Sequence, residues 1–216
     1  MKKCGFTLAE ILLAMALVGV IAAMTVPTFV TNTRNKANAS RLATMVSALN
    51  TGYTSMMVAE AAQDLVDTPY YLKFSNSEGK EAIAELAKYV KISAKDSNVA
   101  ITESGAEVTF EYKDIEDLSE DLAKENGIAV VGTVGLLKID VNGEAKPNRE
   151  GRDIFQFCIG KDGNLYPTGG KMYSLLVDKV STNTWSNEES DYNCDKGTMS
   201  LGCTARLIEE GYEIKY

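Results

Sequence analysis

The chain has 216 residues, of which 45% are hydrophobic and 24% charged, and its formal net charge is -8 because 22 basic side chains face 30 acidic ones. A balance this acidic argues against a protein that holds nucleic acid through contacts to phosphates. The sequence contains no histidine. That excludes a Ser-His-Asp triad, a histidine general base and a histidine-ligated zinc or haem site, and it makes catalysis a weaker expectation.

Charge is distributed unevenly along the N-terminal segment. Between Lys3 and Arg34 the only charged residue is Glu10, and residues 11–26 are almost wholly apolar. Counted back to Phe6, the apolar stretch has about 21 residues, or roughly 30 Å of helix, the thickness of the hydrocarbon core of a bilayer. The segment is therefore long enough to cross a membrane as one helix.

Three interpretations of this segment are open on these residues alone. A secretory signal peptide fits the two basic residues before the apolar run and the small residues near its end, and a plain membrane anchor fits its length. Glu10 counts against both, because a carboxylate inside an apolar helix costs roughly 2.5–3.5 kcal/mol on insertion scales. In the third interpretation, cleavage after Gly5 creates a new amino terminus at Phe6. Glu10 then lies one helical turn away on the same face, where it can pair with an ammonium group.

Residues 1–27, MKKCGFTLAEILLAMALVGVIAAMTVP, resemble the leader and N-terminal helix of type IV pilins and type II secretion pseudopilins. The resemblance rests on a short basic leader ending in Gly5, on Phe6 and Glu10 at their spacing from it, and on an apolar run that reaches Pro27. It implies that a prepilin peptidase cleaves between Gly5 and Phe6 and N-methylates Phe6. It also implies that Glu10 neutralises the terminal amine of a neighbouring subunit during assembly.

Pro27 divides the predicted helix. Proline inside a helix removes a backbone hydrogen bond, so Pro27 either ends the membrane segment or marks a point where the stem bends as subunits pack. Beyond a polar and basic stretch at 32–41, which we expect to lie near lipid headgroups, apolar residues within 42–57 repeat at the spacing of an amphipathic helix. The predicted parts are a leader at 1–5, a membrane-inserted half-helix at 6–27, an amphipathic half-helix at 28–62 and a globular head at 63–216.

The head is expected to be α+β, with antiparallel strands following the long helix, as in pilins. The strand predicted last is an edge strand at the end of the chain. Periodicity and turn signals predict helices at 78–90, 115–124 and 204–210, and strands at 108–112, 128–131, 136–141, 154–159, 165–166 and 212–216.

Oxygen-bearing side chains gather between residues 140 and 153. Asp140, Asn142, Asn148 and Asp153 supply the hard oxygen ligands that calcium prefers. The resemblance favours this interpretation, because several pseudopilins hold calcium in a C-terminal loop. The alternative is that Asp and Asn occur here because turns favour them. Calcium is the one cofactor that the sequence suggests.

Cleavage after Gly5 removes Cys4 and leaves three cysteines. A disulfide between Cys194 and Cys203 would close a short loop, contribute roughly 2.5–3 kcal/mol and suit an oxidising compartment. It would also resemble the C-terminal disulfide loop of many type IV pilins. Cys158 lies in the apolar sequence FQFCI and is expected in the core.

The whole pattern predicts a structural subunit of a type IV pilus or type II secretion pseudopilus rather than an enzyme. The expected precursor spans the inner membrane once with a periplasmic head, and then enters a periplasmic or cell-surface filament. Its expected partners are prepilin peptidase, pilin or pseudopilin subunits of the same or another kind, and membrane lipid, with no direct nucleic-acid binding. The alternative is a membrane-anchored binding or adhesion protein that never polymerises, and a minor pilin at a filament tip lies between the two.

Overall fold

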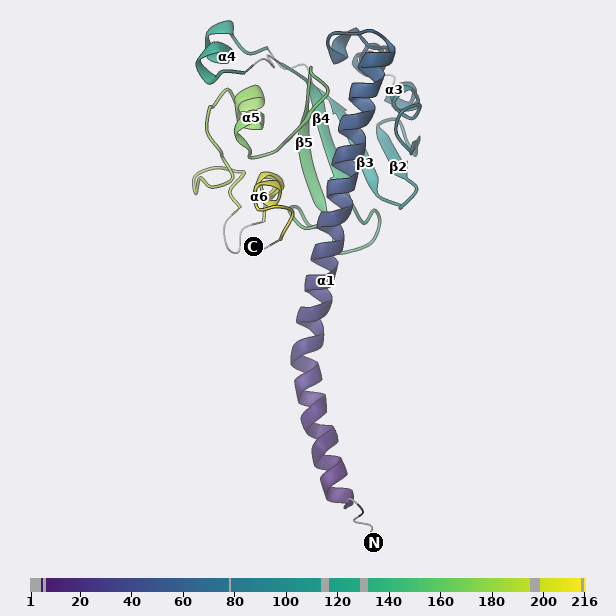
Figure 1. The fold of residues 1–216 in the computed structure, drawn as a ribbon, viewed down its shortest axis with the longest axis vertical. Coiled ribbons are helices and arrows are strands. Elements are labelled where there is room, and N and C mark those ends of the chain that lie inside the picture. Colours follow the sequence, from purple (N-terminus) through teal and green to yellow (C-terminus); the bar gives the residue numbers. More distant parts are fainter. Residues whose placement is uncertain are drawn as a thin grey trace.

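The computed structural model describes residue 5 and residues 7–77, 79–113, 117–128, 132–194, 199–214 and 216. One helix, α1 (Leu8–Ala59), runs for 52 residues and projects far beyond the head as a stem (Figure 1). At 1.5 Å per residue it is about 78 Å long. Pro27 lies inside the helix without ending it.

The head is built on a six-stranded antiparallel sheet in which every strand pairs with its neighbours in sequence, in the order β1-β2-β3-β4-β5-β6. The longest pairings join β3 to β4 and β4 to β5. The predicted α+β class is therefore confirmed. The strands are β1 (Ile92–Ala94), β2 (Val99–Thr102), β3 (Glu107–Tyr112), β4 (Thr133–Asp140), β5 (Ile154–Gly160) and β6 (Leu165–Pro167).

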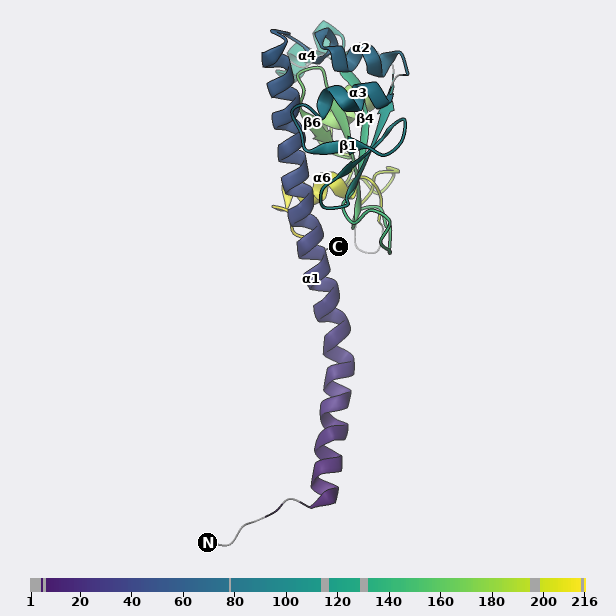
Figure 2. The same cartoon turned by 90° about the vertical axis from the view of Figure 1, so that its right-hand side faces the viewer.

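Short helices complete the head around the sheet. In the view of Figure 2, the second half of α1 runs along the sheet while α2 and α3 pack near its upper end. A π-helical turn (Ser174–Asp178) continues directly from α5. The helices are α2 (Pro69–Ser75), α3 (Gly79–Leu86), α4 (Glu120–Asn126), α5 (Lys171–Tyr173) and α6 (Cys203–Glu209), with a 3-10 turn (Leu65–Asp67) before α2.

Alternation along the central strands separates two apolar clusters. On one face of the sheet, Leu137 and Phe157 are fully buried in the main cluster together with Leu42 and Leu49 of α1. Their neighbours in sequence point to the other face, where the buried residues are Leu136, Cys158, Tyr173 and Leu176. The second half of α1 therefore supplies one wall of the main core.

The sequence missed or misplaced several elements. The terminal strand predicted at 212–216 is wrong, because the described residues there form a turn in which Gly211 and Tyr212 have positive φ angles of 74° and 63°. The hydroxyl of Tyr216 instead donates to the carbonyl of Gly151 at 2.8 Å. Of the strand predicted at 128–131, only Ile128 lies in the described part and it is not in a strand. β1, β2, α2, and α5 with its π-helical turn are elements that the sequence patterns do not predict.

Candidate functional site

The start of the stem is held by a reciprocal pair of polar residues. The amide of Glu10 donates to the hydroxyl of Thr7 at 3.3 Å, and the amide and hydroxyl of Thr7 each donate to Glu10 Oε2 at 2.8 Å. This arrangement is a capping box, which satisfies backbone donors at a helix start. The Thr-x-x-Glu spacing is the signal in the sequence that could have predicted this cap. Of the predicted cleavage site, Gly5 is exposed and Phe6 lies outside the described residues.

The first half of α1 presents apolar side chains on all sides. No residue from 8 to 34 is buried, and Leu13 and Phe29 remain 73% and 72% exposed. By length and composition, this helix could cross a membrane. A helix that is apolar all round needs lipid or protein around it. The large exposed side chains are Leu8, Ile11, Leu12, Leu13, Met15, Leu17, Val18, Val20, Ile21, Met24, Val26, Phe29 and Val30.

Comparison with protein families gives an independent identification of this segment. Residues 1–26 match the family model of the prokaryotic N-terminal methylation motif. The N-terminus is a prepilin-type leader of the type IV pilin and pseudopilin family. The predicted resemblance is thus confirmed. Searches of curated proteins and of solved structures returned no match to the chain.

Threonine side chains surround Pro27 in the prepilin-type stem. The hydroxyl of Thr25 donates to the carbonyl of Ile21 at 3.0 Å, and that of Thr31 donates to the carbonyl of Pro27 at 2.9 Å. Such bonds back onto the preceding turn weaken and bend helices, and Pro27 also lacks an amide proton. These features are expected to weaken the helix locally, and the stem curves gently below the head in Figure 2.

The second half of α1 is fixed to the head by polar bonds as well as by packing. The side-chain amide of Asn38 donates to the carbonyl of Arg152 at 3.2 Å, and Asn50 Oδ1 accepts from the amide of Leu165 at 3.0 Å. The hydroxyls of the buried Tyr53 and Tyr70 lie 3.2 Å apart. Burial raises the pKa of both phenols well above their usual value. The head and the second half of α1 therefore share one core and several polar bonds.

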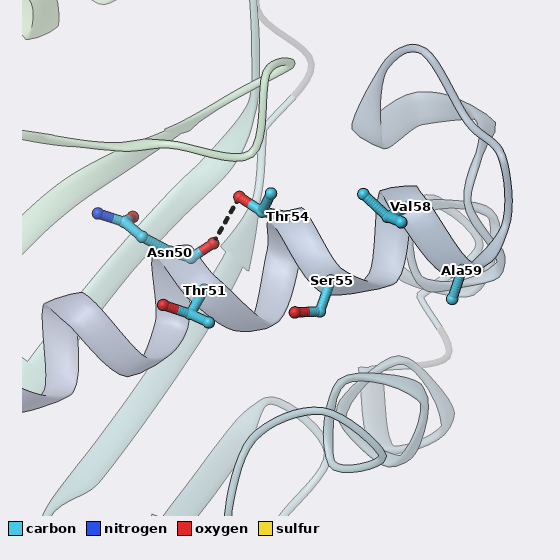
Figure 3. Close-up of a pocket in the computed structure, with 6 residues that line it drawn as sticks. All are labelled: Asn50, Thr51, Thr54, Ser55, Val58 and Ala59. Carbon is cyan, nitrogen blue, oxygen red and sulfur yellow. Dashed lines mark hydrogen bonds between the residues drawn. The ribbon is translucent and has the colours of Figure 1, made fainter.

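Near its end, α1 carries mostly short polar side chains on one side, together with the exposed Val58 and with Asn50, which also bonds to the head. A shallow hollow there is shown in Figure 3. The hydroxyl of Thr54 donates to the carbonyl of Asn50 at 2.9 Å, so it is turned back onto its own helix. Val58 is the large apolar side chain of this side and is 76% exposed. The lining residues are Asn50, Thr51, Thr54, Ser55, Val58 and Ala59.

The C-terminal segment is closed by the disulfide that the sequence suggested. Cys194 and Cys203 are bonded, with their Cα atoms 5.0 Å apart. Arg206 braces the bridge, because its Nη1 donates to the carbonyl of Cys194 and its guanidinium lies 5.5 Å from the ring centre of Trp185. Cys158 is free and fully buried, and burial raises the pKa of its thiol far above the usual range. It is an inert core residue, as expected.

The structure brings together three of the four residues suggested for calcium. The amide of Asn142 donates to Asp140 Oδ1 at 3.1 Å, and Asn142 Nδ2 donates to Asp153 Oδ2 at 3.3 Å. Asp153 also accepts from the amide of Arg149. Burial, with a smaller contribution from the charge of Asp153, raises the pKa of Asp140.

Asn148 stands apart from that trio. It is exposed and has a positive φ angle of 47°, and no hydrogen bond among the described residues joins it to the other three. The described part of the chain contains no group of three or more His, Cys, Asp or Glu side chains placed to hold a metal. The geometry that is present stabilises a turn, and calcium stays a prediction.

Proposed function

We propose that this chain is a structural subunit of a type IV pilus or a type II secretion pseudopilus, made as a single-pass inner-membrane precursor with a periplasmic head. One observation carries the proposal: the helix that follows the prepilin-type leader is apolar on all sides and is left uncovered by its own head. Lipid would cover this surface before assembly, and the stems of neighbouring subunits would cover it afterwards.

Processing comes first in this proposal. Prepilin peptidase cleaves between Gly5 and Phe6 and methylates Phe6, so the basic leader is lost while the apolar helix stays attached. Assembly then exchanges lipid contacts for helix contacts without exposing the stem to water. The weak stretch around Pro27 lets the stem adjust its curvature to its neighbours.

Glu10 sets the axial register in the proposed filament. It is the only charged residue between Lys3 and Arg34, so its carboxylate is the one charge within the stem that can neutralise a neighbouring amino terminus at Phe6. Burial among apolar helices would strengthen that pairing, because an unpaired charge there is costly. The role proposed for the chain is structural rather than catalytic.

The mass of the N-terminal peptide from the purified protein tests the processing step. We expect a peptide that begins with N-methyl-Phe6. A start near Met24 would indicate an ordinary secreted protein, and an intact Met1 would indicate an unprocessed anchor.

Crosslinking tests the assembly step. A photo-reactive residue at Leu17, which is 62% exposed on the stem, should give a ladder of crosslinked subunits in cells. The same residue in a Glu10→Ala background is the control, and there we expect mainly crosslinks to lipid. Exclusively monomeric product from the otherwise native chain would favour the membrane-anchored binding protein instead.

A further inference from the structure

A small cavity of about 110 Å³ lies where the stem meets the head. One wall comes from α1 and includes Arg34, Asn35 and Asn38, and the other comes from the loop between β4 and β5 and includes Arg152 and Asp153. The two walls are joined by the bond from the Asn38 side chain to the Arg152 carbonyl, at 3.2 Å. The same bond fixes the backbone that carries the Arg152 side chain.

The cavity has an excess of positive charge and of hydrogen-bond donors. Arg152 Nε is buried and has no hydrogen-bond partner within the described part of the chain, which is a costly state for a charged donor. Among the described residues, neither Arg34 nor Arg152 forms an ion pair. Asp153 is the one carboxylate in the lining, and both of its oxygens already accept hydrogen bonds, from the Arg149 amide and the Asn142 side chain.

The depth of the cavity along α1 matches the level of lipid phosphates. If the hydrocarbon core begins near Leu8, about 20 helical residues span its roughly 30 Å, so it ends near Thr28. Val30 and Thr31, which also line the cavity, then lie about 3–5 Å beyond that boundary, within the headgroup layer. The apolar side chain of Val30 therefore lies on the membrane side of Arg34 along α1.

We propose that the cavity between α1 and the β4–β5 loop binds a phosphate group, held by Arg34 and Arg152. Guanidinium groups suit phosphate because their donors match its oxygens in pairs, and the amide groups of Asn35 and Asn38 add neutral donors. The phosphate belongs either to a membrane phospholipid or to a free phosphate ion. This site rests on the membrane insertion in the proposed function but does not require filament formation.

Binding to the full chain in a phosphate-free non-ionic detergent tests the site. Native mass spectrometry would follow retention of phosphatidylglycerol, with diacylglycerol of the same acyl chains as the control lipid, and calorimetry would follow inorganic phosphate. We expect one phosphate ligand per chain. Arg152→Gln and Arg34→Gln should each reduce the affinity by about ten-fold or more. Arg149→Gln is the matched control, because Arg149 is exposed on the same loop and does not line the cavity.

The outcomes separate the two sources. Arginine-dependent retention of phosphatidylglycerol that inorganic phosphate does not displace identifies a lipid site, and displacement by inorganic phosphate identifies a free phosphate site. Equal retention of diacylglycerol, equal binding by Arg34→Gln and the native chain, or no binding overturns the proposal. Arg34 is exposed, so Arg34→Gln tests the site without disturbing the core. N-terminal methylation and stem crosslinking are measured separately, so a failure here is distinguishable from a failure of the filament proposal.

Discussion

The two halves of α1 belong to one uninterrupted helix but have opposite environments. Leu13 in the stem is 73% exposed, whereas Leu49 in the packed half is 2% exposed. The packed half repeats its apolar residues on one face, which the head can cover. The stem is apolar all round, and no single face of a head could cover it. The apolar surface of the stem is therefore available for contacts outside its own chain.

The largest expected effect comes from the charge in the stem. Glu10→Ala and Glu10→Gln should both reduce filament assembly by about ten-fold or more, because each removes the carboxylate that would pair with a neighbouring amine. Membrane insertion and the thermal stability of the head should not change, since Glu10 contacts only the start of the stem. Filament yield from sheared cells and membrane fractionation measure the two quantities.

The glutamine variant separates charge pairing from helix capping. Glutamine can replace glutamate in a capping box, so Glu10→Gln keeps the bond to Thr7 while losing the charge. Thr7→Ala keeps the charge of Glu10 and the bond from the amide of residue 7, but it loses both bonds made by the hydroxyl. Normal filaments from Glu10→Gln would show that Glu10 acts through the capping box, and the register proposal would then be wrong.

A matched pair of leucines tests the contrast between the halves directly. Leu49→Ala should lower the free energy of unfolding of the head by about 2–5 kcal/mol, because it leaves a cavity in the main core. Leu13→Ala should change it by less than about 0.5 kcal/mol. Denaturant unfolding of both variants in detergent, followed by Trp185 fluorescence, gives the comparison. Similar losses in the two variants would mean that the stem also packs on the head.

The disulfide should matter for the head alone. Replacing both Cys194 and Cys203 with serine should lower the free energy of unfolding by about 2.5–3 kcal/mol, because the unfolded chain regains the entropy of an open loop. Membrane insertion should be unaffected. A reductant should reproduce the loss in the native chain, and the double variant should then show no further response. An unchanged unfolding midpoint after reduction would contradict this expectation.

A smaller effect on stability is expected from calcium at the loop between β4 and β5, which contains Asn142 and Asp153 and is preceded by Asp140. Ca²⁺ at about ten times its dissociation constant should stabilise the head by about 1.4 kcal/mol, and Asp140→Asn should abolish the gain. Asn148→Ala is the control, since Asn148 stands apart from the other three residues. A response to Ca²⁺ that survives Asp140→Asn would exclude this site.

Without calcium, the carboxyl group of Asp140 makes the stability of the head depend on pH. The direction is opposite to that of an acid in a salt bridge. The folded state raises the pKa of Asp140 above its usual value of 3.8, so it disfavours the ionised form. Stability is therefore greater at low pH and falls as the pH rises through that raised pKa. Asp140→Asn should remove this dependence, which thermal unfolding between acid and neutral pH would detect.

Several elements of the head were predictable because their signals are local. The alternation in β3 and the turn between β5 and β6 placed those strands correctly to within a residue or two. β1 has three residues and β2 has four, so both are too short to give a periodic pattern. The final five residues alternate as a strand would, but Gly211 and Tyr212 have a left-handed backbone, and the described residues that follow form no strand.

By itself, the sequence predicted a processing site and located the apolar stem and the amphipathic half of α1, and it favoured the pairing of Cys194 with Cys203 that the structure shows. Each depends on spacing within a short stretch of chain or on the few cysteines present. Only the tertiary structure decided which residues anchor α1, since Asn38 and Arg152 are 114 positions apart. The cavity proposed to bind phosphate was also decided only by the tertiary structure. Its walls meet only after the β4–β5 loop has folded against α1.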